Sequence, residues 1–158
     1  MTQLNELSQQ NGTRRIVAGT AELRGVVVDI VSRAERTLSI LTPNLEPEIY
    51  EHEEFLVALK RFVLAKTFAR VRVLITEPER TIKNGNQLVE MGQRLSSYIE
   101  MRNLTSKLRP ESRAYCIADT DSVLYRADYA TNEGMVAQQA PEIAKLYLTE
   151  FEEIWQAS

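Results

Sequence analysis

The chain has 158 residues, of which 44% are hydrophobic and 26% are charged, and this composition is that of one globular domain. A formal charge of −3 argues against a general nucleic-acid-binding protein, because such a protein needs a basic surface. The single cysteine, Cys116, excludes a disulfide framework, and the single histidine, His52, excludes a multi-histidine metal centre within the chain.

The N-terminal region is polar, and no apolar run in the chain approaches the length of a membrane span. The first residues show no secretory signal, so we expect a cytoplasmic domain without a membrane span. Residues 1–19 lack a sustained hydrophobic period. We therefore expect a mobile tail there, with a short ordered piece at residues 15–18, followed by a single domain over residues 20–158.

From residue 20 onward, hydrophobic periodicity predicts helices that alternate with strands. Thr20 is the expected N-cap of the first helix, and Pro43 ends the first strand. The KNGN sequence at 83–86 is typical of a turn. In order, the predicted elements are a helix at 21–35, a strand at 37–42, a helix at 53–67, a strand at 71–76 and a helix at 87–102.

The pattern changes after residue 110, where short strands replace long helices. Strands at 113–118 and 122–126 flank Asp119 and Asp121, and this turn chemistry predicts a β-hairpin. A short strand is predicted at 134–137, and Pro141 opens a last helix that ends near residue 156. The apolar face of that helix is expected to contain Ile143, Leu146, Phe151, Ile154 and Trp155. Together the elements predict an α/β fold with a mixed β-sheet flanked by helices.

Three segments resemble one half of the phospholipase D superfamily. The first is TLSILTPN at residues 37–44, and the second is FLVALKRFVLAKTFARVRVLIT at residues 55–76. The third is NEGMVAQQAPEIAKLYLTEFEEIW near the C-terminus. The resemblance extends over residues 23–155 and implies a phospholipase D-like half-domain. It also implies a homodimer, because two such halves face each other across a twofold axis in that superfamily.

The signature motif of that superfamily is H-x-K-x(4)-D followed by G-S-x-N, and this sequence keeps only the aspartate, as Asp119. The other signature positions hold Ser112, Ala114, Arg126, Ala127 and Tyr129. Phosphodiester exchange in the superfamily needs an imidazole nucleophile and a cation for the phosphate, so the resemblance implies a chain without that activity. Seven residues of strand span about 23 Å, and Asp119 is therefore expected to be a structural turn residue at the far end of the hairpin.

The open end of the hairpin is the predicted pocket for an anion or another ligand. With Thr120 and Asp121 at the tip, Arg126 lies opposite Tyr115 and Tyr129 lies opposite Ser112. The residues expected to gather there are Ser112, Arg113, Arg126, Asp128, Tyr129, Asn132 and Glu133, with Thr42 and Asn44 placed close by on the strength of the resemblance. The two arginines could hold a phosphate-like anion, or they could pair with Asp128 and Glu133.

Other candidate residues have structural explanations. His52 lies among glutamates and is predicted to be a solvated surface residue, whereas Cys116 is predicted to be a small buried residue of a strand. Asp119 and Asp121 are interpreted as backbone caps in preference to metal ligands. The glutamate-rich stretch 46–54 is either a docking surface for a basic partner or a solvated helix start.

The sequence favours a non-catalytic phospholipase D-like domain with a binding, assembly or regulatory role. Its expected partners are a second copy of the chain, another protein or a phosphate-like anion, and no cofactor or metal is predicted. One alternative is a divergent phosphodiesterase or hydrolase in which the residues of the predicted pocket converge on a substrate. A third hypothesis is a nucleic-acid-binding protein, against which the acidic net charge argues.

Overall fold

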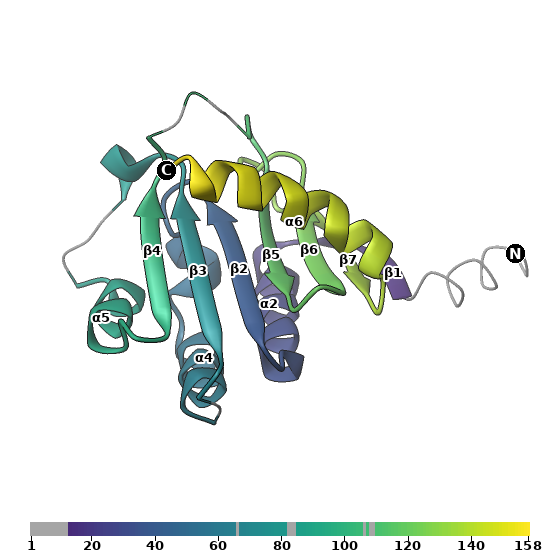
Figure 1. Cartoon of the computed structure of the whole chain (residues 1–158). Helices are drawn as coiled ribbons and strands as arrows, with labels where there is room; N and C mark the ends of the chain where they lie inside the picture. Colours follow the sequence, from purple (N-terminus) through teal and green to yellow (C-terminus); the bar gives the residue numbers. More distant parts are fainter. Residues whose placement is uncertain (1–12, 66, 82–84, 106, 108–109) are drawn as a thin grey trace, which may run out of the picture.

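The computed structural model describes residues 13–158 except residues 66, 82–84, 106, 108 and 109. These residues form a seven-stranded sheet in the order β1-β7-β6-β5-β2-β3-β4 (Figure 1). The strands are β1 (Thr13–Ala18), β2 (Thr37–Thr42), β3 (Arg70–Ile75), β4 (Ile99–Asn103), β5 (Ala114–Ala118), β6 (Ser122–Arg126) and β7 (Glu133–Gln138). The helices are α2 (Thr20–Arg33), α3 (Pro47–Tyr50), α4 (Glu53–Ala65), η1 (Pro78–Arg80), α5 (Gln87–Arg94) and α6 (Pro141–Gln156).

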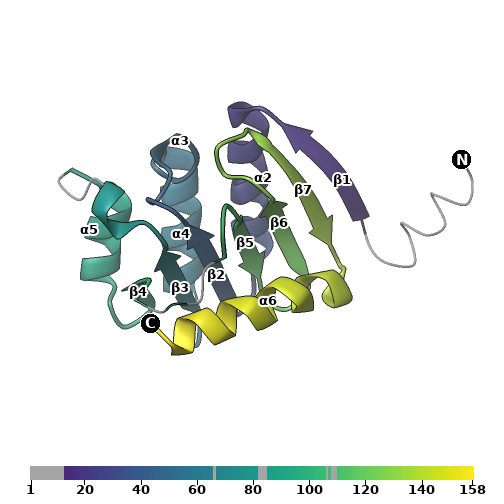
Figure 2. The ribbon, with the colours of Figure 1, turned by 90° about the horizontal axis from the view of Figure 1, so that it is seen from above.

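The sheet is mixed, as the alternation of elements predicts. Strands β2, β3 and β4 run parallel, and the remaining neighbours pair antiparallel. Helices α2, α4 and α5 cover one face, while α6 crosses the other face (Figures 1 and 2). The predicted α/β fold with a mixed sheet between helices is therefore confirmed.

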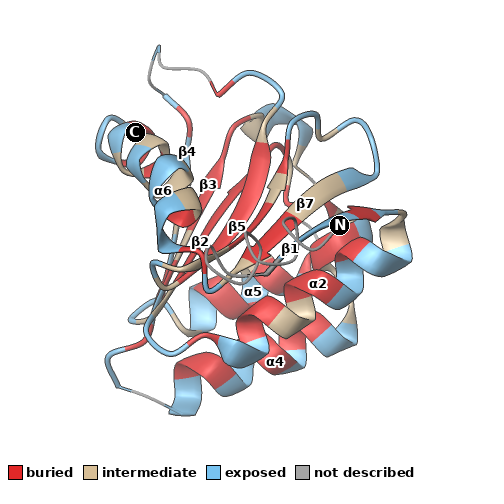
Figure 3. Ribbon diagram, turned by 90° about the vertical axis from the view of Figure 1, so that its right-hand side faces the viewer, coloured by how far each residue is buried: buried red, intermediate tan, exposed pale blue. Residues whose placement is uncertain are grey.

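Two buried apolar clusters hold the layers together, one on each face of the sheet (Figure 3). The larger lies under α2 and α4 and includes the fully buried Leu23 and Phe55. The smaller lies under α6, where Phe151 and Trp155 stack with ring centroids 5.6 Å apart. The expectation that Leu146 faces inward is wrong, because 68% of its surface is exposed on the outer side of α6.

The predicted helix over 87–102 is also wrong in its second half. Asn86 caps α5 by accepting a hydrogen bond from the Val89 N–H at 3.0 Å, as a helix start requires. However, α5 ends at Arg94, and Ile99 begins β4 in parallel register with Val71. An apolar residue four positions after another fits a helical face, but the same residue also fits a strand buried on one side.

The predicted hairpin of β5 and β6 is confirmed, with a register shifted by one residue. Ala118 faces Ser122 and Ala114 faces Arg126, so the connecting loop contains three residues and not two. Asp119 opens that loop with a left-handed φ of 56°, a conformation that Asp adopts more readily than most residues with a side chain. A shift of one residue moves every side chain to the other face, so Arg126 shares the face of Ala114 and not that of Tyr115.

The N-terminal strand β1 is the ordered piece expected at 15–18, and it begins earlier, at Thr13. It pairs with β7 at the edge of the sheet. Residues 1–12 of the expected tail lie outside the described residues, as do residues 83 and 84 of the expected 83–86 turn. Thr20 is not the N-cap of α2, because Gly19 occupies that position with a φ of 96° and Thr20 is already helical.

Candidate functional site

A buried ion pair lies at the end of the sheet where β6 finishes and β5 begins. Arg126 is 4% exposed, and its Nη1 donates to the Oε2 atom of Glu46, a residue of the loop after β2. The Nη2 atom donates to the backbone oxygens of Tyr129 at 2.9 Å and Thr131 at 3.0 Å. The guanidinium is therefore neutralised and held by groups of its own chain.

Glu46 is held in place by the last residues of β2 and the loop that follows. Its Oε1 atom accepts a hydrogen bond from the Thr42 hydroxyl at 3.1 Å, and its N–H donates to Asn44 Oδ1 at 3.1 Å. Leu45 and Glu46 both have positive φ, at 68° and 30°, a backbone conformation that is costly for residues with a side chain. Burial raises the pKa of the Glu46 carboxyl, and the nearby Arg126 opposes this rise. Thr42 and Asn44 thus lie near Arg126, as the resemblance implied.

Two more side chains with buried polar groups follow Glu46 in the sequence: Tyr50 is the last residue of α3, and His52 directly precedes α4. Burial raises the pKa of the Tyr50 hydroxyl well above its ordinary value, and its ring meets Phe55 edge to face at 5.1 Å. The prediction of a solvated His52 is wrong, because its side chain is half-buried. The His52 Nε2 atom is buried and has no hydrogen-bond partner among the described residues.

The glutamate-rich stretch 46–54 does not form one acidic surface. Glu46 is buried against Arg126, while Glu51 accepts hydrogen bonds from the N–H groups of Gln87 at 2.6 Å and Leu88 at 3.4 Å. Glu51 therefore caps the N-terminus of α5, where a carboxylate is favoured. Glu48 in the first turn of α3, and Glu53 and Glu54 in the first turn of α4, are exposed and fit the predicted solvated helix start.

Arg113 is neutralised by a different carboxylate from the one expected. Its guanidinium pairs with Glu150 of α6, and the Tyr115 hydroxyl donates to the same carboxylate at 3.0 Å. The hydrogen bond with Glu150 raises the pKa of Arg113. Of the two alternatives that the sequence left open for these arginines, pairing with Asp128 and Glu133 does not occur, since Arg113 uses Glu150 and Arg126 uses Glu46.

The other residues of the predicted pocket mostly shape the backbone. The Tyr129 N–H donates to the Ser112 carbonyl at 2.9 Å, so these two residues are neighbours, as predicted. Asp128 Oδ1 accepts from the Ala130 N–H at 2.9 Å and closes a turn. The Asn132 carbonyl accepts from the N–H of the residue before α2, and Glu133 begins β7 with an exposed side chain.

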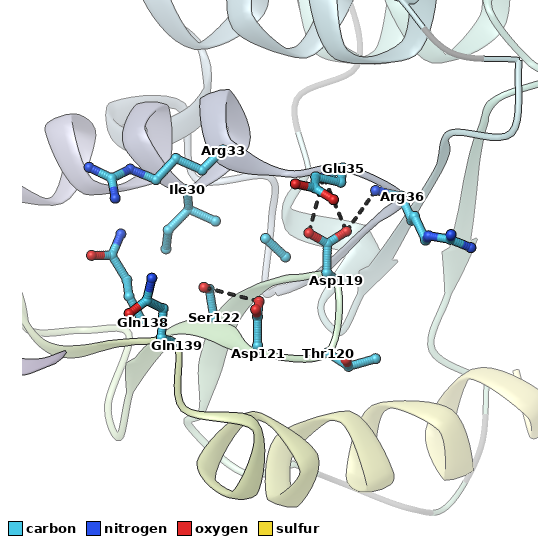
Figure 4. Close-up of a pocket in the computed structure, with 11 residues that line it drawn as sticks. Ile30, Arg33, Glu35, Arg36, Asp119, Thr120, Asp121, Ser122, Gln138 and Gln139 are labelled. Carbon is cyan, nitrogen blue, oxygen red and sulfur yellow. Dashed lines mark hydrogen bonds between the residues drawn. The ribbon is translucent and has the colours of Figure 1, made fainter. Parts of the chain in front are cut away.

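Asp119 lies at the opposite end of the strands, at the end of β5 that is far from Ser112. Its side chain caps backbone N–H groups. Its carboxylate accepts backbone hydrogen bonds from Glu35 at 3.0 Å and Arg36 at 2.7 Å (Figure 4). It also accepts one from the Thr37 N–H at 3.1 Å. The structural interpretation of Asp119 is thus confirmed, although its partners come from the α2–β2 connection and not from its own turn. No group of three metal-ligating side chains occurs among the described residues.

An open cleft of about 370 Å³ adjoins Asp119. Its walls come from the end of α2, the β5–β6 loop and the end of β7 (Figure 4). Arg33 on its rim pairs with Asp29, and the Gln138 amide donates to the other oxygen of Asp29 at 2.8 Å. Two of the polar side chains of this cleft, Arg33 and Gln138, are therefore engaged with Asp29.

Sequence reasoning missed Glu46, Tyr50 and Glu150 as partners in these networks. Glu46 and Arg126 are separated by 80 positions in the sequence, and Arg113 and Glu150 by 37. No local pattern links residues so far apart. The one available signal was that Arg126 sits at the end of an apolar strand, where a buried arginine needs a buried carboxylate.

Solved structures of other proteins share this fold. Nuc from Salmonella typhimurium, described as a phospholipase D family member, matches with a TM-score of 0.61 and 18% identity over 91% of this chain and 95% of Nuc. NucT from Helicobacter pylori matches with a TM-score of 0.62 and 11% identity over 92% and 96% of the two chains. The archaeal chromatin protein TrmBL2 matches with a TM-score of 0.66 and 15% identity over 98% of this chain, which spans 59% of TrmBL2.

These similarities show a phospholipase D-like α/β fold. Residues 19–158 match the family described as Domain of unknown function (DUF7931), and the chain belongs to that family. No curated protein matches the sequence. Among the described residues, no helix has both the length and the apolar character that crossing a membrane requires.

Proposed function

We propose that this chain is a non-catalytic phospholipase D-like domain that acts through binding and assembly. The observation that carries the proposal is the buried pair of Arg126 and Glu46. A site for phosphodiester exchange must leave cationic donors free for the phosphate oxygens. In this chain Nη1 and Nη2 of Arg126 donate to the Glu46 carboxylate and to two backbone carbonyls, and its buried Nε has no partner among the described residues.

The remaining motif positions lack the groups that such chemistry needs. Ser112 stands at the nucleophile position, and a serine hydroxyl requires an adjacent general base. The one imidazole of the chain, His52, belongs to the segment between α3 and α4 and packs 6.2 Å from the Phe55 ring. Asp119 is held at the other end of β5 by its three backbone hydrogen bonds. These positions support a domain that keeps the superfamily's fold but lacks the groups needed for its phosphodiester chemistry.

A phosphate-like anion is a candidate ligand of this domain only if it displaces Glu46 from Arg126. The carboxylate already supplies the negative charge that the guanidinium attracts. Displacement would leave a buried glutamate without its partner, which is costly. A second copy of the chain or another protein is therefore the partner that this proposal favours.

The test of the proposal is a phosphodiesterase assay on the purified chain. Bis(p-nitrophenyl) phosphate and single-stranded DNA serve as substrates, with and without divalent metal ions. The proposal expects no turnover above that of buffer. Turnover that disappears in Ser112→Ala but persists in Ser122→Ala would overturn it and favour the divergent hydrolase.

DNA binding is a second candidate, favoured by one observation. TrmBL2 is reported as a chromatin protein with a novel mode of DNA binding, and it shares this fold. The formal charge of −3 weighs against the same role here. A Kd for duplex DNA that weakens steeply as salt rises would support this candidate, because phosphate contacts release counterions. A lack of binding at low salt would exclude it.

A further inference from the structure

The outer edge of β4 carries backbone groups that the sheet does not use. β4 is the last strand in the order of the described sheet, and it pairs with β3 on its inner side (Figures 1 and 2). The Val71 N–H donates to the Tyr98 carbonyl at 2.8 Å, and the Leu104 N–H donates to the Ile75 carbonyl at 2.8 Å. In a parallel ladder, alternate residues of a strand bond to the same neighbour. The even-numbered residues of β4 therefore face β3, and the odd-numbered ones face outward.

Three residues of β4 direct their backbone groups to the outside, namely Ile99, Met101 and Asn103. The Ile99 N–H is already used, because it donates to the Leu95 carbonyl at 2.9 Å. Within the part of the chain that the structure describes, no backbone partner meets the Ile99 carbonyl, either group of Met101 or the Asn103 N–H. Four successive groups of this edge are thus available to another strand.

A groove of about 400 Å³ runs along this edge, between β4 and α5. Ile99 belongs to the larger apolar cluster, Met101 packs against that cluster, and Val89 of α5 lines the groove with them. Gly92 allows α5 to lie close to β4, since a Cβ atom at this position would be 2.9 Å from the Cε atom of Met101. Figure 1 shows α5 beside β4. A free strand edge with an apolar groove along it is suited to an extended peptide that adds a strand to the sheet.

We propose that this edge binds an extended segment of another protein, which pairs parallel to β4 and places one aliphatic side chain in the groove. This inference rests on the binding role proposed above, and it names the surface and the chemistry of the partner. The central residue of the segment is the one that pairs with Met101. Its side chain lies on the α5 side of the sheet, because paired residues share a face.

The used N–H of Ile99 favours the parallel direction. In a parallel ladder, the residue before the central one bonds to the Ile99 C=O and the Met101 N–H. The residue after it bonds to the Met101 C=O and the Asn103 N–H, so the segment meets all four free groups. In the antiparallel direction, the residue opposite Ile99 turns its carbonyl to an N–H that Leu95 already holds. A carbonyl that loses water without gaining a donor is destabilising.

Charge complementarity defines the residues on either side of the central one. Their side chains lie on the other face of the sheet, where Glu100 and Arg102 form an ion pair at 2.8 Å. Neighbouring strands are about 4.8 Å apart, and the parallel register places the first flanking residue beside Glu100 and the second beside Arg102. A basic residue suits the first position and an acidic residue suits the second. The expected motif is therefore basic–aliphatic–acidic.

The first test is fluorescence anisotropy of a labelled peptide, Ser-Thr-Lys-Val-Glu-Thr-Ser, titrated with the full chain. The expected result is saturable binding that is about fivefold tighter than for the same peptide with glutamate in place of lysine. Glu100→Lys should reverse this preference, and it should not disturb folding, because 56% of the Glu100 side chain is exposed. Glu90→Lys is the matched control, since Glu90 is exposed on α5 outside the groove, and it should keep the preference of the wild-type chain. A preference that Glu100→Lys leaves unchanged would overturn the proposed register.

The second test measures which backbone groups of the peptide bind. Methylation of the backbone nitrogen of either flanking residue should weaken binding by about tenfold or more, because both N–H groups donate to β4 in the parallel register. Methylation of the central nitrogen should leave the Kd unchanged, because this N–H points away from β4. The opposite pattern would show antiparallel pairing and would overturn the proposed direction.

Two outcomes would overturn a peptide partner altogether. The first is an absence of binding at a chain concentration of about 1 mM. This result would leave the proposed non-catalytic role intact, because the phosphodiesterase assay tests that role separately. The second is self-association of the chain in sedimentation velocity that Glu100→Lys abolishes and Glu90→Lys does not. Such a result would show that the edge is occupied by a second copy of the chain.

Discussion

Arg126 offers the sharpest prediction about stability. Arg126→Met keeps the aliphatic stem of the side chain and removes the guanidinium. It leaves the Glu46 carboxylate with Thr42 as its remaining side-chain donor, and it leaves two backbone carbonyls without their donor. We expect a large loss in the free energy of unfolding, measured by urea denaturation followed by circular dichroism.

The magnitude follows from the burial of the pair. The side chains of Arg126 and Glu46 are 4% and 8% exposed, so removing one leaves the other as an uncompensated buried charge. Breaking such a pair costs about 3–5 kcal/mol. The matched control is Arg33→Met, which breaks an exposed pair with Asp29 and should cost no more than about 1 kcal/mol.

A second substitution and a change of pH identify the cause of this loss. Glu46→Gln added to Arg126→Met removes the buried charge, so the double variant should lose only about 1–3 kcal/mol, from unsatisfied hydrogen bonds. In Arg126→Met the pKa of Glu46, already raised by burial, rises further. A raised folded-state pKa gives stability that is full below the unfolded pKa and is lost as pH rises through the folded pKa.

The loss in Arg126→Met should therefore be larger at pH 7 than at pH 5. The reasoning is refuted if Arg126→Met is no more destabilising than Arg33→Met, or if its effect does not change with pH.

Three further predictions concern groups outside this pair. Asp119→Ala removes the acceptor of three backbone N–H groups and should cost about 2 kcal/mol by urea denaturation, whereas Asp121→Ala should cost less than half of that. Tyr115→Phe removes the hydrogen bond to Glu150 and should cost about 1 kcal/mol; an unchanged denaturation midpoint would contradict that bond. Burial raises the pKa of the Cys116 thiol to about 12, so a disulfide reagent at pH 8 should label it only after denaturation.

The fold could be predicted from the sequence where one periodicity dominated. The strand at 37–42 and the helix over 141–156 occur with the predicted bounds, because the proline that ends the strand and the proline that opens the helix are local signals. The prediction failed at Ile99, whose spacing from Leu95 fits a helix as well as a strand. Ile99 forms a strand because it pairs with Val71, and pairing between residues so far apart cannot be detected from the local sequence.

The candidate site shows the same division. Asp119 could be interpreted as a structural cap, because strand geometry places it far from Ser112. The neighbourhood of Arg126 and Thr42 could be inferred from the resemblance. The partner of Arg126 could not, since Glu46 is one of several glutamates in its stretch and only the backbone turn at Leu45 and Glu46 aims it inward.

The most direct test of the central claim is a titration of the wild-type chain with inorganic phosphate, monitored as the melting temperature. A ligand that binds only the folded state raises this temperature, and the rise increases with the logarithm of ligand concentration once that concentration exceeds the Kd. Because Glu46 already occupies Arg126, we predict no phosphate-specific rise relative to chloride at equal ionic strength. A saturable rise that Arg126→Met abolishes would show that the Arg126 guanidinium is available to an anion. That result would contradict the claim that Glu46 blocks anion binding at Arg126.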